Sequence, residues 1–367
     1  MVYDPETNEI IDQDYKNLCA EMYAEGHSFF TYISDSADSL ASCCRLRNKL
    51  AKNTFNPTSG LTGIKTGSCN VITLNINHIV QDWYRMMEKL NPGWNKEKAV
   101  QSEADLCEYI TEILERVYKY HIVYKTMLYE WEERGVFASS NGGYINIRNL
   151  YSTIGVNGHN EAARFLGLEV SNNPRYIRFL QVILGTIKEQ NEKYSIRDNK
   201  RPFVFNSECV PAESLGAKNY NRDKAMGYWV PEDENLYNSY FYNAHDNTSV
   251  LDKFILHGKQ VSRYCDGGSA CHINLDNHLS KEQYLKLIDF AIKHGTNYFT
   301  FNIPNSKCED CGHITKHPLD KCPKCGSENI TQYTRVIGYL RPITAFSKDR
   351  QIEASQRVYS DGRTEIC

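Results

Sequence analysis

The sequence predicts an α/β fold in which parallel strands alternate with helices. Short apolar runs rich in β-branched and aromatic residues recur along the chain, bounded by turn-forming residues. Longer stretches with apolar residues at helical spacing separate these runs. Such alternation is typical of sheets whose neighbouring strands are parallel. The apolar fraction of 41% and the charged fraction of 24% suit a globular protein with one large core or two smaller ones.

The elements of the first third follow from residue type and spacing. The run Phe29-Phe30-Thr31-Tyr32-Ile33 contains the aromatic and β-branched residues that favour strands. Apolar residues recur at the spacing of one helix face around Ile110 and Leu114, and Asn91-Pro92-Gly93 breaks the helical pattern. In order, we expect a helix at 15–24, a strand at 29–33, a loop at 34–39, a strand at 70–76, and helices at 78–90 and 96–133.

The remaining elements alternate in the same way. Phe203-Val204-Phe205 is a continuous apolar run, as in strands buried on both faces. Gly155 and Gly158 indicate a turn-rich loop. In order, we expect a strand at 144–147, a loop at 153–158, helices from 161 and at 176–192, a strand at 203–206, a loop leading into a helix at 211–216, a strand at 270–275, a helix at 280–294 and a strand at 298–303.

Net charge and cysteine content exclude several classes of protein. The formal net charge of −3 provides no basic surface for nucleic acid. No apolar run approaches the roughly 20 residues of a membrane helix, and the acidic segment 1–14 lacks signal-peptide character. Thirteen cysteines, an odd number without a secretory signal, indicate reduced thiols in a cytosol. We therefore expect a cytoplasmic protein with no membrane or nucleic-acid partner.

Four of the cysteines form two close pairs in the arrangement C-x2-C-x10-C-x2-C. Each pair directs two sulfur atoms toward one point, and two pairs complete a tetrahedron around Zn²⁺. Gly312 and Gly326 follow the pairs, where a chain turning around a metal uses glycine's access to positive φ. Four thiolates leave no open coordination position, so the zinc would stabilise the fold and perform no chemistry. The predicted ligands are Cys308, Cys311, Cys322 and Cys325.

Shortly after this zinc site comes the octapeptide Arg335-Val336-Ile337-Gly338-Tyr339-Leu340-Arg341-Pro342. Zinc site and octapeptide together resemble the C-terminal end of the anaerobic (class III) ribonucleoside-triphosphate reductases, in which the glycine of R-V-x-G-Y-x-R-P is a stable glycyl radical. The resemblance implies that Gly338 carries the radical. Only glycine lacks a side chain at Cα, so its carbon radical can become planar between an N–H and a C=O group. Taken alone, the octapeptide would suit a turn glycine equally well.

The segment 35–46 resembles the finger loop of this family, which enters the barrel and presents the cysteine that becomes a thiyl radical. Family members carry a Cys-Arg pair there, which places the radical at Cys44, with Cys43 as the alternative. An S–H bond is close in strength to a ribose C–H bond, so hydrogen transfer between them is nearly thermoneutral. Without the match of the whole segment, both residues would be interpreted as buried structural cysteines.

A candidate phosphate loop, Pro211-Ala212-Glu213-Ser214, follows an apolar run and opens a predicted helix. Unpaired backbone N–H groups at a helix start form an anion site. Related reductases hold substrate phosphate on a small-residue loop at a similar distance after the finger cysteine. The resemblance therefore assigns Ala212, Glu213 and Ser214 to substrate phosphate, mainly through their backbone. An ordinary helix N-cap is the alternative.

The resemblance also implies an architecture. Class III reductases are ten-stranded α/β barrels made of two five-stranded parallel halves, and this chain corresponds to the second half. Residues 1–304 then form the C-terminal half of the catalytic barrel, with the finger loop near 35–48, and residues 305–367 form the zinc-binding and glycyl radical domain. The tail keeps the family pattern except at Phe346, where the family usually has tryptophan. We expect a split or truncated enzyme that needs the N-terminal half of the reductase and dimerises when complete.

The implied activity is anaerobic reduction of ribonucleoside triphosphates to deoxyribonucleoside triphosphates, a step in DNA precursor synthesis. A separate activase with S-adenosylmethionine and an iron–sulfur cluster generates the Gly338 radical, which takes hydrogen from Cys44, and the thiyl radical abstracts the ribose 3′-hydrogen. The alternatives are another glycyl radical enzyme, a non-enzymatic zinc-ribbon interaction module and an inactive gene remnant. The zinc site argues against the first, and the finger and phosphate segments argue against the second.

Overall fold

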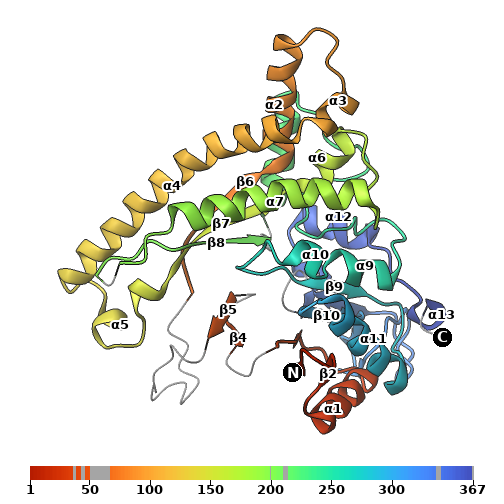
Figure 1. Ribbon diagram of the computed structural model, residues 1–367. Coiled ribbons are helices and arrows are strands. Elements are labelled where there is room, and N and C mark those ends of the chain that lie inside the picture. The colour runs from red at the N-terminus through yellow and green to blue at the C-terminus, as the bar shows by residue number, and fades with distance from the viewer. Residues whose placement is uncertain are drawn as a thin grey trace.

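The α/β class predicted from the sequence is confirmed by the fold (Figure 1). The structure is a computed structural model. It describes residues 1–35, 39–42, 46–49, 67–198, 200–209, 214–335 and 340–365.

A parallel sheet of three strands forms the centre of the first part. Its strands are β6 (Ser68–Asn75), β7 (Tyr151–Asn157) and β8 (Phe205–Cys209), in that order. An isolated parallel bridge from Glu208 to Gly268 connects the β8 edge to the chain that enters β9 (Cys271–Asn274). Strand β9 pairs in parallel with β10 (Tyr298–Asn302), and β3 (Thr31–Tyr32) pairs antiparallel with the other edge of β10. The predicted parallel arrangement therefore holds for β6 to β10.

Helices cover one face of the β6–β8 sheet (Figure 1). Ile154 and Val156 of β7 point to this face and join a core with Trp83, Tyr118 and other helix side chains. Strands β4 (Ser39–Ser42) and β5 (Leu46–Lys49) pair antiparallel on the opposite side of the sheet. None of the described helices is long and apolar enough to cross a membrane. Helices α4 (Glu103–Glu133) and α7 (Pro174–Tyr194) lie over this face, and α2 (Ile76–Leu90), α3 (Lys96–Gln101) and α6 (His159–Phe165) add side chains to the same core.

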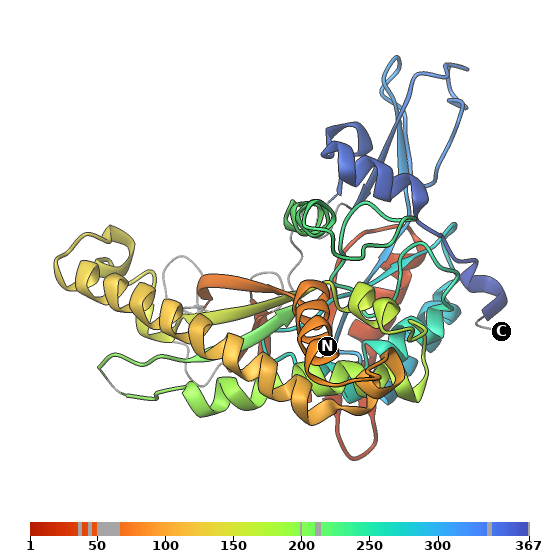
Figure 2. The same cartoon turned by 90° about the horizontal axis from the view of Figure 1, so that it is seen from above.

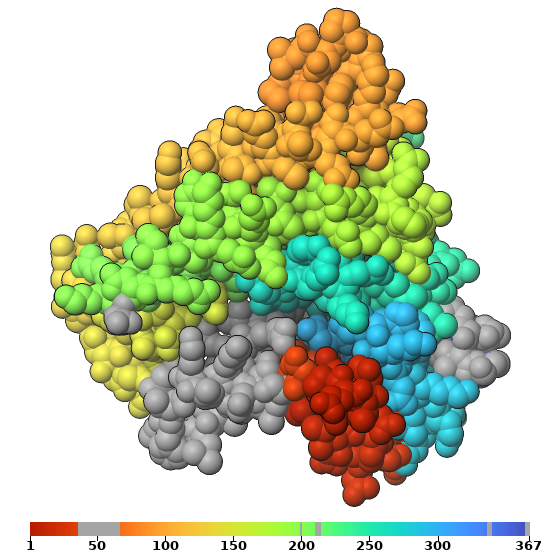
Figure 3. Space-filling model, viewed as in Figure 1, coloured from red at the N-terminus to blue at the C-terminus, as the bar shows by residue number. Residues whose placement is uncertain are grey.

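A second core lies around β9 and β10. Tyr23, Phe254, Tyr284 and Phe301 pack there, between the two strands and three helices. The helices are α1 (Gln13–Ala24), α9 (Val250–Leu256) and α11 (Lys281–His294), and Ser280 with Gln283 forms a capping box at the start of α11. The space-filling view shows α4, α7, the α9–α10 region, α11 and α1 as successive bands across one face (Figure 3).

The C-terminal part is a small antiparallel sheet of order β12-β11-β13-β14. Figure 2 shows it projecting from the rest of the molecule, with α12 (Lys348–Gln356) beside it. Its strands are β11 (Asn305–Cys308), β12 (Ile314–Thr315), β13 (Ile330–Arg335) and β14 (Leu340–Pro342). The remaining elements are β1 (Tyr3–Asp4), β2 (Glu9–Ile10), α5 (Ala138–Asn141), η2 (Ile147–Asn149), α8 (Leu215–Ala225), α10 (Lys259–Ser262), η3 (Ile343–Ala345) and α13 (Gly362–Glu365).

Three expected elements differ from the structure. The expected strand at 144–147 is wrong, because η2 begins there at Ile147. The expected loop at 153–158 is also wrong, because β7 covers most of it; pairing with β6 and β8 on both sides overrides the turn preference of Gly155. The long helix expected at 96–133 is two helices, and the chain bends at Ser102, whose φ and ψ are −90° and 56°.

Candidate functional site

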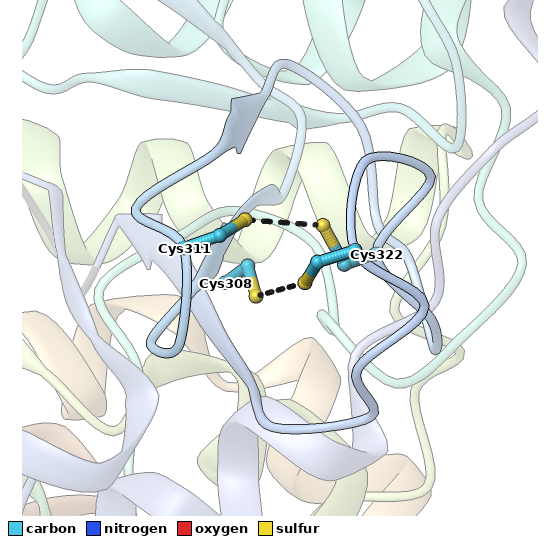
Figure 4. Close-up of side chains that lie close together, drawn as sticks. Cys308, Cys311 and Cys322 are labelled. Atoms are coloured by element: carbon cyan, nitrogen blue, oxygen red, sulfur yellow. Dashed lines mark hydrogen bonds between the residues drawn. The ribbon is translucent and has the colours of Figure 1, made fainter.

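Four thiol groups converge beyond the end of β11 (Figure 4). The Sγ atoms of Cys308 and Cys325 are 3.6 Å apart, as are those of Cys311 and Cys322. All four sulfur atoms lie within 4.8 Å of one another. Thiolates at about 2.3 Å from a tetrahedral zinc ion would be about 3.8 Å apart. The four-cysteine cluster therefore has the size and donor set of a structural zinc site, and neither His313 nor His317 belongs to it.

Both cysteine pairs sit in the same backbone turn, which explains why the sequence folds this way locally. In each turn the amide of the first cysteine donates to a carbonyl five residues later, at 2.8 Å, and its own carbonyl accepts from the glycine amide, at 2.9 Å. The glycines have φ of +71° and +73°, a conformation that other residues adopt at a cost. The turns are formed by Cys308 with Gly312 and His313, and by Cys322 with Gly326 and Ser327.

Polar side chains connect the two turns to each other and to the body of the molecule. The carboxylate of Asp310 accepts from Ser327 Oγ at 2.5 Å and from Asn329 Nδ2 at 2.8 Å. The Nζ atom of Lys316 donates to the carbonyl of Glu25, 2.5 Å away, just after α1. The cluster is therefore attached to α1 as well as to the β11–β13 sheet.

The predicted radical residue, Gly338, lies outside the described residues. Strands β13 and β14 pair antiparallel on either side of it, with Arg335 opposite Leu340 in the register. Residues 336–339, which we call the radical loop, connect the two strands. The structure thus describes the strand ends on either side of residues 336–339, and the role of Gly338 stays a prediction.

Arg335, the last described residue before the radical loop, is buried and held from several directions. Its amide donates to Asn302 Oδ1 on β10, 3.1 Å away. Its guanidinium donates to Ser28 Oγ at 2.8 Å and lies 4.7 Å from the ring centroid of Phe30. Asn302 also exchanges hydrogen bonds with Thr334. The end of β13 is therefore fixed to the end of a strand of the parallel sheet.

The C-terminal tail contributes a buried ion cluster at the same place. The carboxylate of Glu353 on α12 is fully buried and accepts from Nε and Nη2 of Arg357, at 2.8 and 2.7 Å. Nη1 of Arg350 is 3.4 Å from it. Burial opposes ionisation of Glu353, but the two guanidinium groups more than offset this effect and hold its pKa below the usual value. The third nitrogen of Arg357, Nη1, donates to the carbonyl of Arg335 at 2.7 Å.

The finger cysteines, Cys43 and Cys44, also lie outside the described residues. The strands on either side are described: β4 and β5 pair antiparallel, with Ser42 opposite Leu46. Both strands lie on the side of the parallel sheet that the helices leave open (Figure 1). Which of the two cysteines carries chemistry stays a prediction.

The candidate phosphate loop is described only at its end. Ala212 and Glu213 lie outside the described residues, whereas Ser214 precedes α8 and accepts from the Lys218 amide at 3.0 Å through its carbonyl. The Ser214 side chain is exposed and makes no capping hydrogen bond. The predicted order of a strand followed by a helix is confirmed by β8 and α8. The assignment of these residues to phosphate stays a prediction.

A polar row across β6, β7 and β8 was missed by the sequence analysis. Ser68 Oγ is hydrogen-bonded to Thr153 Oγ1, which donates to Asn206 Oδ1 at 2.7 Å. Thr153 is the neighbour of the core residue Ile154, so by strand alternation the row faces away from the helices, toward the side of β4 and β5. The available signal was the pair of polar residues Thr153 and Asn206 at opposite positions of two strands, hidden because β7 was expected to be a loop.

A second buried charge cluster lies beside α6. Arg164 donates to Glu234 at 2.5 Å and to Asp233 at 2.8 Å. Burial raises the pKa of Glu234 to about 7, despite the nearby guanidinium. Glu161 is buried next to it, and burial together with the charge of Glu234 raises its pKa well above the usual value. These two carboxyl groups therefore retain protons at pH values where exposed glutamates are ionised.

Comparison with known proteins identifies the family. The profile of the family described as anaerobic ribonucleoside-triphosphate reductase matches residues 2–359. The chain belongs to this family. No curated protein sequence matches it.

Solved anaerobic ribonucleotide reductases share the fold of this family member. One has 26% identity and a TM-score of 0.75, with 98% of this chain and 54% of that chain covered. The Thermotoga maritima enzyme with glycerol in its active site has 26% identity, a TM-score of 0.75 and coverage of 96% and 55%. The same enzyme in complex with dATP and CTP has 26% identity, a TM-score of 0.72 and coverage of 95% and 54%. This chain spans about half the length of these relatives.

Proposed function

We propose that this chain is the radical-bearing part of an anaerobic ribonucleoside-triphosphate reductase, which forms deoxyribonucleoside triphosphates for DNA synthesis. The observation that carries the proposal is the family match over residues 2–359, which includes the finger segment, the four-cysteine cluster and the octapeptide around Gly338. The pairing of β4 with β5 and of β13 with β14 supports it, because each pair brackets one of the two radical positions.

The proposed reaction uses the chain's own glycine and cysteine in sequence. An activase of the S-adenosylmethionine and iron–sulfur class removes a hydrogen atom from Gly338. The Gly338 radical takes the thiol hydrogen of Cys44, and the thiyl radical abstracts the 3′-hydrogen of the bound ribonucleotide. Loss of water from C2′ follows, an external reductant supplies two electrons and two protons overall, and the Cys44 thiol returns its hydrogen to C3′, which regenerates the thiyl radical and then, by hydrogen transfer from Gly338, the glycyl radical. Cys43 is the alternative thiol.

Substrate phosphate would bind at the start of α8. Backbone N–H groups of Ala212, Glu213 and Ser214 precede this helix, and the first N–H groups of a helix together with its dipole attract anions. The loop follows the C-terminal end of β8, and ligands in α/β sheets bind at the carboxyl ends of parallel strands. This position supports a phosphate subsite at the carboxyl end of β8.

Zinc would be held by Cys308, Cys311, Cys322 and Cys325, whose sulfur spacing fits a tetrahedral site. When bound there, zinc supplies structural stability and takes no part in the reaction, because all four positions are occupied by protein ligands. Its place beyond β11 supports a role in fixing the sheet that carries the radical loop.

We further propose that residues 1–304 form the second half of a ten-stranded barrel and residues 305–367 its radical domain. Five successive strands, β6 to β10, run parallel in the described part, which supports the first assignment. The relatives are about twice as long, so a segment upstream of the matched part would supply the other half, and the complete enzyme would dimerise.

Anaerobic reconstitution tests the proposed function. The chain is combined with the upstream half of the reductase and the activase, and deoxyribonucleotide formation from CTP, ATP, GTP and UTP is measured. We expect product only when all components are present, and none with Gly338→Ala, because the added methyl group crowds a planar radical. A fully reconstituted complex that forms an organic radical but no deoxyribonucleotide would favour another glycyl radical enzyme. Zinc uptake with neither radical nor product would favour the interaction module or the inactive remnant.

A further inference from the structure

We infer that Arg357 is a positioning residue for the glycyl radical: it holds the main chain next to the radical loop through the carbonyl of Arg335. The inference rests on the proposed function, because it concerns the placement of Gly338, three residues further along. It adds a role for the C-terminal tail that neither the zinc site nor the octapeptide supplies.

The Arg357 side chain contacts both a buried carboxylate and the main chain of β13. Among its contacts with described residues, Nε and Nη2 of the guanidinium contact Glu353, and Nη1 donates to the Arg335 carbonyl at 2.7 Å. The planar fork of arginine makes both contacts in one orientation. The side chain is only 5% exposed, so water does not compete effectively for either partner. A buried carboxylate thus orients the donor that reaches the end of β13.

The residues that follow Arg357 are hydrogen-bonded to other parts of the molecule. The next residue, Val358, donates its amide to the carbonyl of Ala244 at 3.0 Å. Ser360 forms a parallel bridge with Leu275, and its amide donates to Asn274 at the end of β9, also at 3.0 Å. The tail around Arg357 is therefore attached to the parallel sheet by contacts that do not involve β13.

These contacts meet at Arg335. Arg335 receives one hydrogen bond from the tail, through its carbonyl, and gives one to Asn302 on β10, through its amide. The tail is attached at the end of β9, and β9 and β10 are neighbours in one sheet. The last residue of β13 is thus held through both its main-chain amide and its main-chain carbonyl to elements of one sheet. A hydrogen atom moves between two groups only at near-contact distance, and a misplacement of about 1 Å can cost about 100-fold in rate.

The experiment compares three variants with the wild type: Arg357→Gln, which removes the charge and the fork; Arg357→Lys, which keeps only the charge; and Arg164→Gln as matched control. Arg164 also bridges to a buried glutamate, Glu234, but contacts neither β13 nor β14 in the described part of the chain. Each protein is activated in the reconstituted complex, the glycyl radical is counted by electron paramagnetic resonance, and product is expressed per radical.

For Arg357→Gln we expect zinc content and a radical signal like those of the wild type, with product per radical lowered about 10- to 100-fold. Arg357→Lys should give an intermediate value, because one ammonium group cannot reproduce the fork. Arg164→Gln should lower thermal stability and leave product per radical unchanged. A purely structural role for Arg357 would reduce radical yield and product together, so product per radical within twofold of the wild type would overturn the inference.

Hydrogen exchange on the chain without its partner separates this inference from the proposed function. Amides at the end of β13 and in β14 should exchange faster in Arg357→Gln than in the wild type, whereas those of β11 should not. If the wild-type complex forms no radical, the proposed function fails, whereas hydrogen exchange still tests whether Arg357 holds the end of β13. If the amides of β13 and β14 exchange equally fast in Arg357→Gln and the wild type, the inference is overturned even if the enzyme is active.

Discussion

The guanidinium of Arg357 donates a hydrogen bond to the carbonyl of Arg335 across 22 positions of sequence. It connects the C-terminal tail to the last described residue of β13, immediately before the radical loop. Because the same guanidinium pairs with the buried carboxylate of Glu353, the charge cluster and the end of β13 form one hydrogen-bonded unit.

Replacing Glu353 by glutamine should destabilise the folded chain by about 3–5 kcal/mol, because two buried guanidinium groups lose their countercharge. The midpoint of urea unfolding measures the change. Glu103→Gln is the control, since the pair of Glu103 with Arg178 is largely exposed and should contribute less than about 1 kcal/mol. Equal effects of the two substitutions would show that the Glu353 cluster contributes no more than a surface pair.

Metal analysis of the purified chain should find one zinc per chain, and Cys311→Ser should lose it. Cys107→Ser, a change at a half-buried cysteine outside the cluster, should retain it. Removing the metal with a chelator should increase proteolysis within residues 305–335, because site and local fold form together. Less than about half an equivalent of zinc in the wild type would rule out a resident four-thiolate site.

The features that the sequence analysis predicted correctly depend on residues close together in the sequence, whereas those it missed depend on residues far apart. The four-cysteine cluster was predictable because each ligand pair and its glycine lie within one turn, and α11 was predictable from its own residues. Strand β7 was not, because its state depends on pairing with β6 and β8, each at least 50 positions away. The Arg335–Arg357 contact carries no local pattern either. Among the predicted site residues, the structure confirms that the four cysteines of the zinc site lie together, as their spacing in the sequence predicted. The roles of Gly338, Cys43, Cys44, Ala212 and Glu213 stay predictions.

The stability of the Glu234→Gln variant relative to the wild type should increase between about pH 5 and about pH 7.5. The pKa of Glu234 is raised to about 7 by burial, so its contribution to stability is complete below the usual carboxyl pKa and is lost as the pH rises through about 7. Glutamine does not ionise, so the Glu234→Gln variant does not lose stability in this way as the pH rises. Urea unfolding at both pH values measures the difference.

Asp233→Asn is the control for this pH dependence. Burial acts against ionisation of Asp233, but the hydrogen bond from Arg164 keeps its pKa below the usual value. Asp233 is therefore ionised in both the folded and the unfolded chain throughout this pH range. The stability of Asp233→Asn relative to the wild type should stay constant. A Glu234→Gln variant whose relative stability stays constant or falls with pH would contradict the assignment of a protonated carboxyl group.

Cys44→Ser and Cys43→Ser should behave differently in the activated complex. A hydroxyl O–H bond is too strong to give its hydrogen to a glycyl radical, so Cys44→Ser should form the Gly338 radical and reduce no nucleotide. Cys43→Ser should keep measurable turnover. Radical signal and deoxyribonucleotide formation are measured on the same samples, and the opposite pattern would assign the thiyl radical to Cys43.

The position of the radical can be read from the chain itself. A glycyl radical reacts with O₂ at its α-carbon, and the peroxyl species that forms breaks the backbone there. Admitting air to the activated complex should therefore cut the chain at Gly338. Gly338→Ala should show neither radical nor cut, whereas Gly185→Ala should show both, because Gly185 lies in α7, outside the octapeptide, and an added Cβ there would meet Tyr264 at an ordinary contact distance of 3.5 Å.

Mass spectrometry of the air-exposed complex is the most direct test of the central claim. The proposed function predicts a large fragment that ends near Ile337 and a tail that runs from about Tyr339 to Cys367, in proportion to the radical counted before exposure. A strong organic radical signal followed by an intact chain, or by a cut elsewhere, would contradict the assignment of the radical to Gly338.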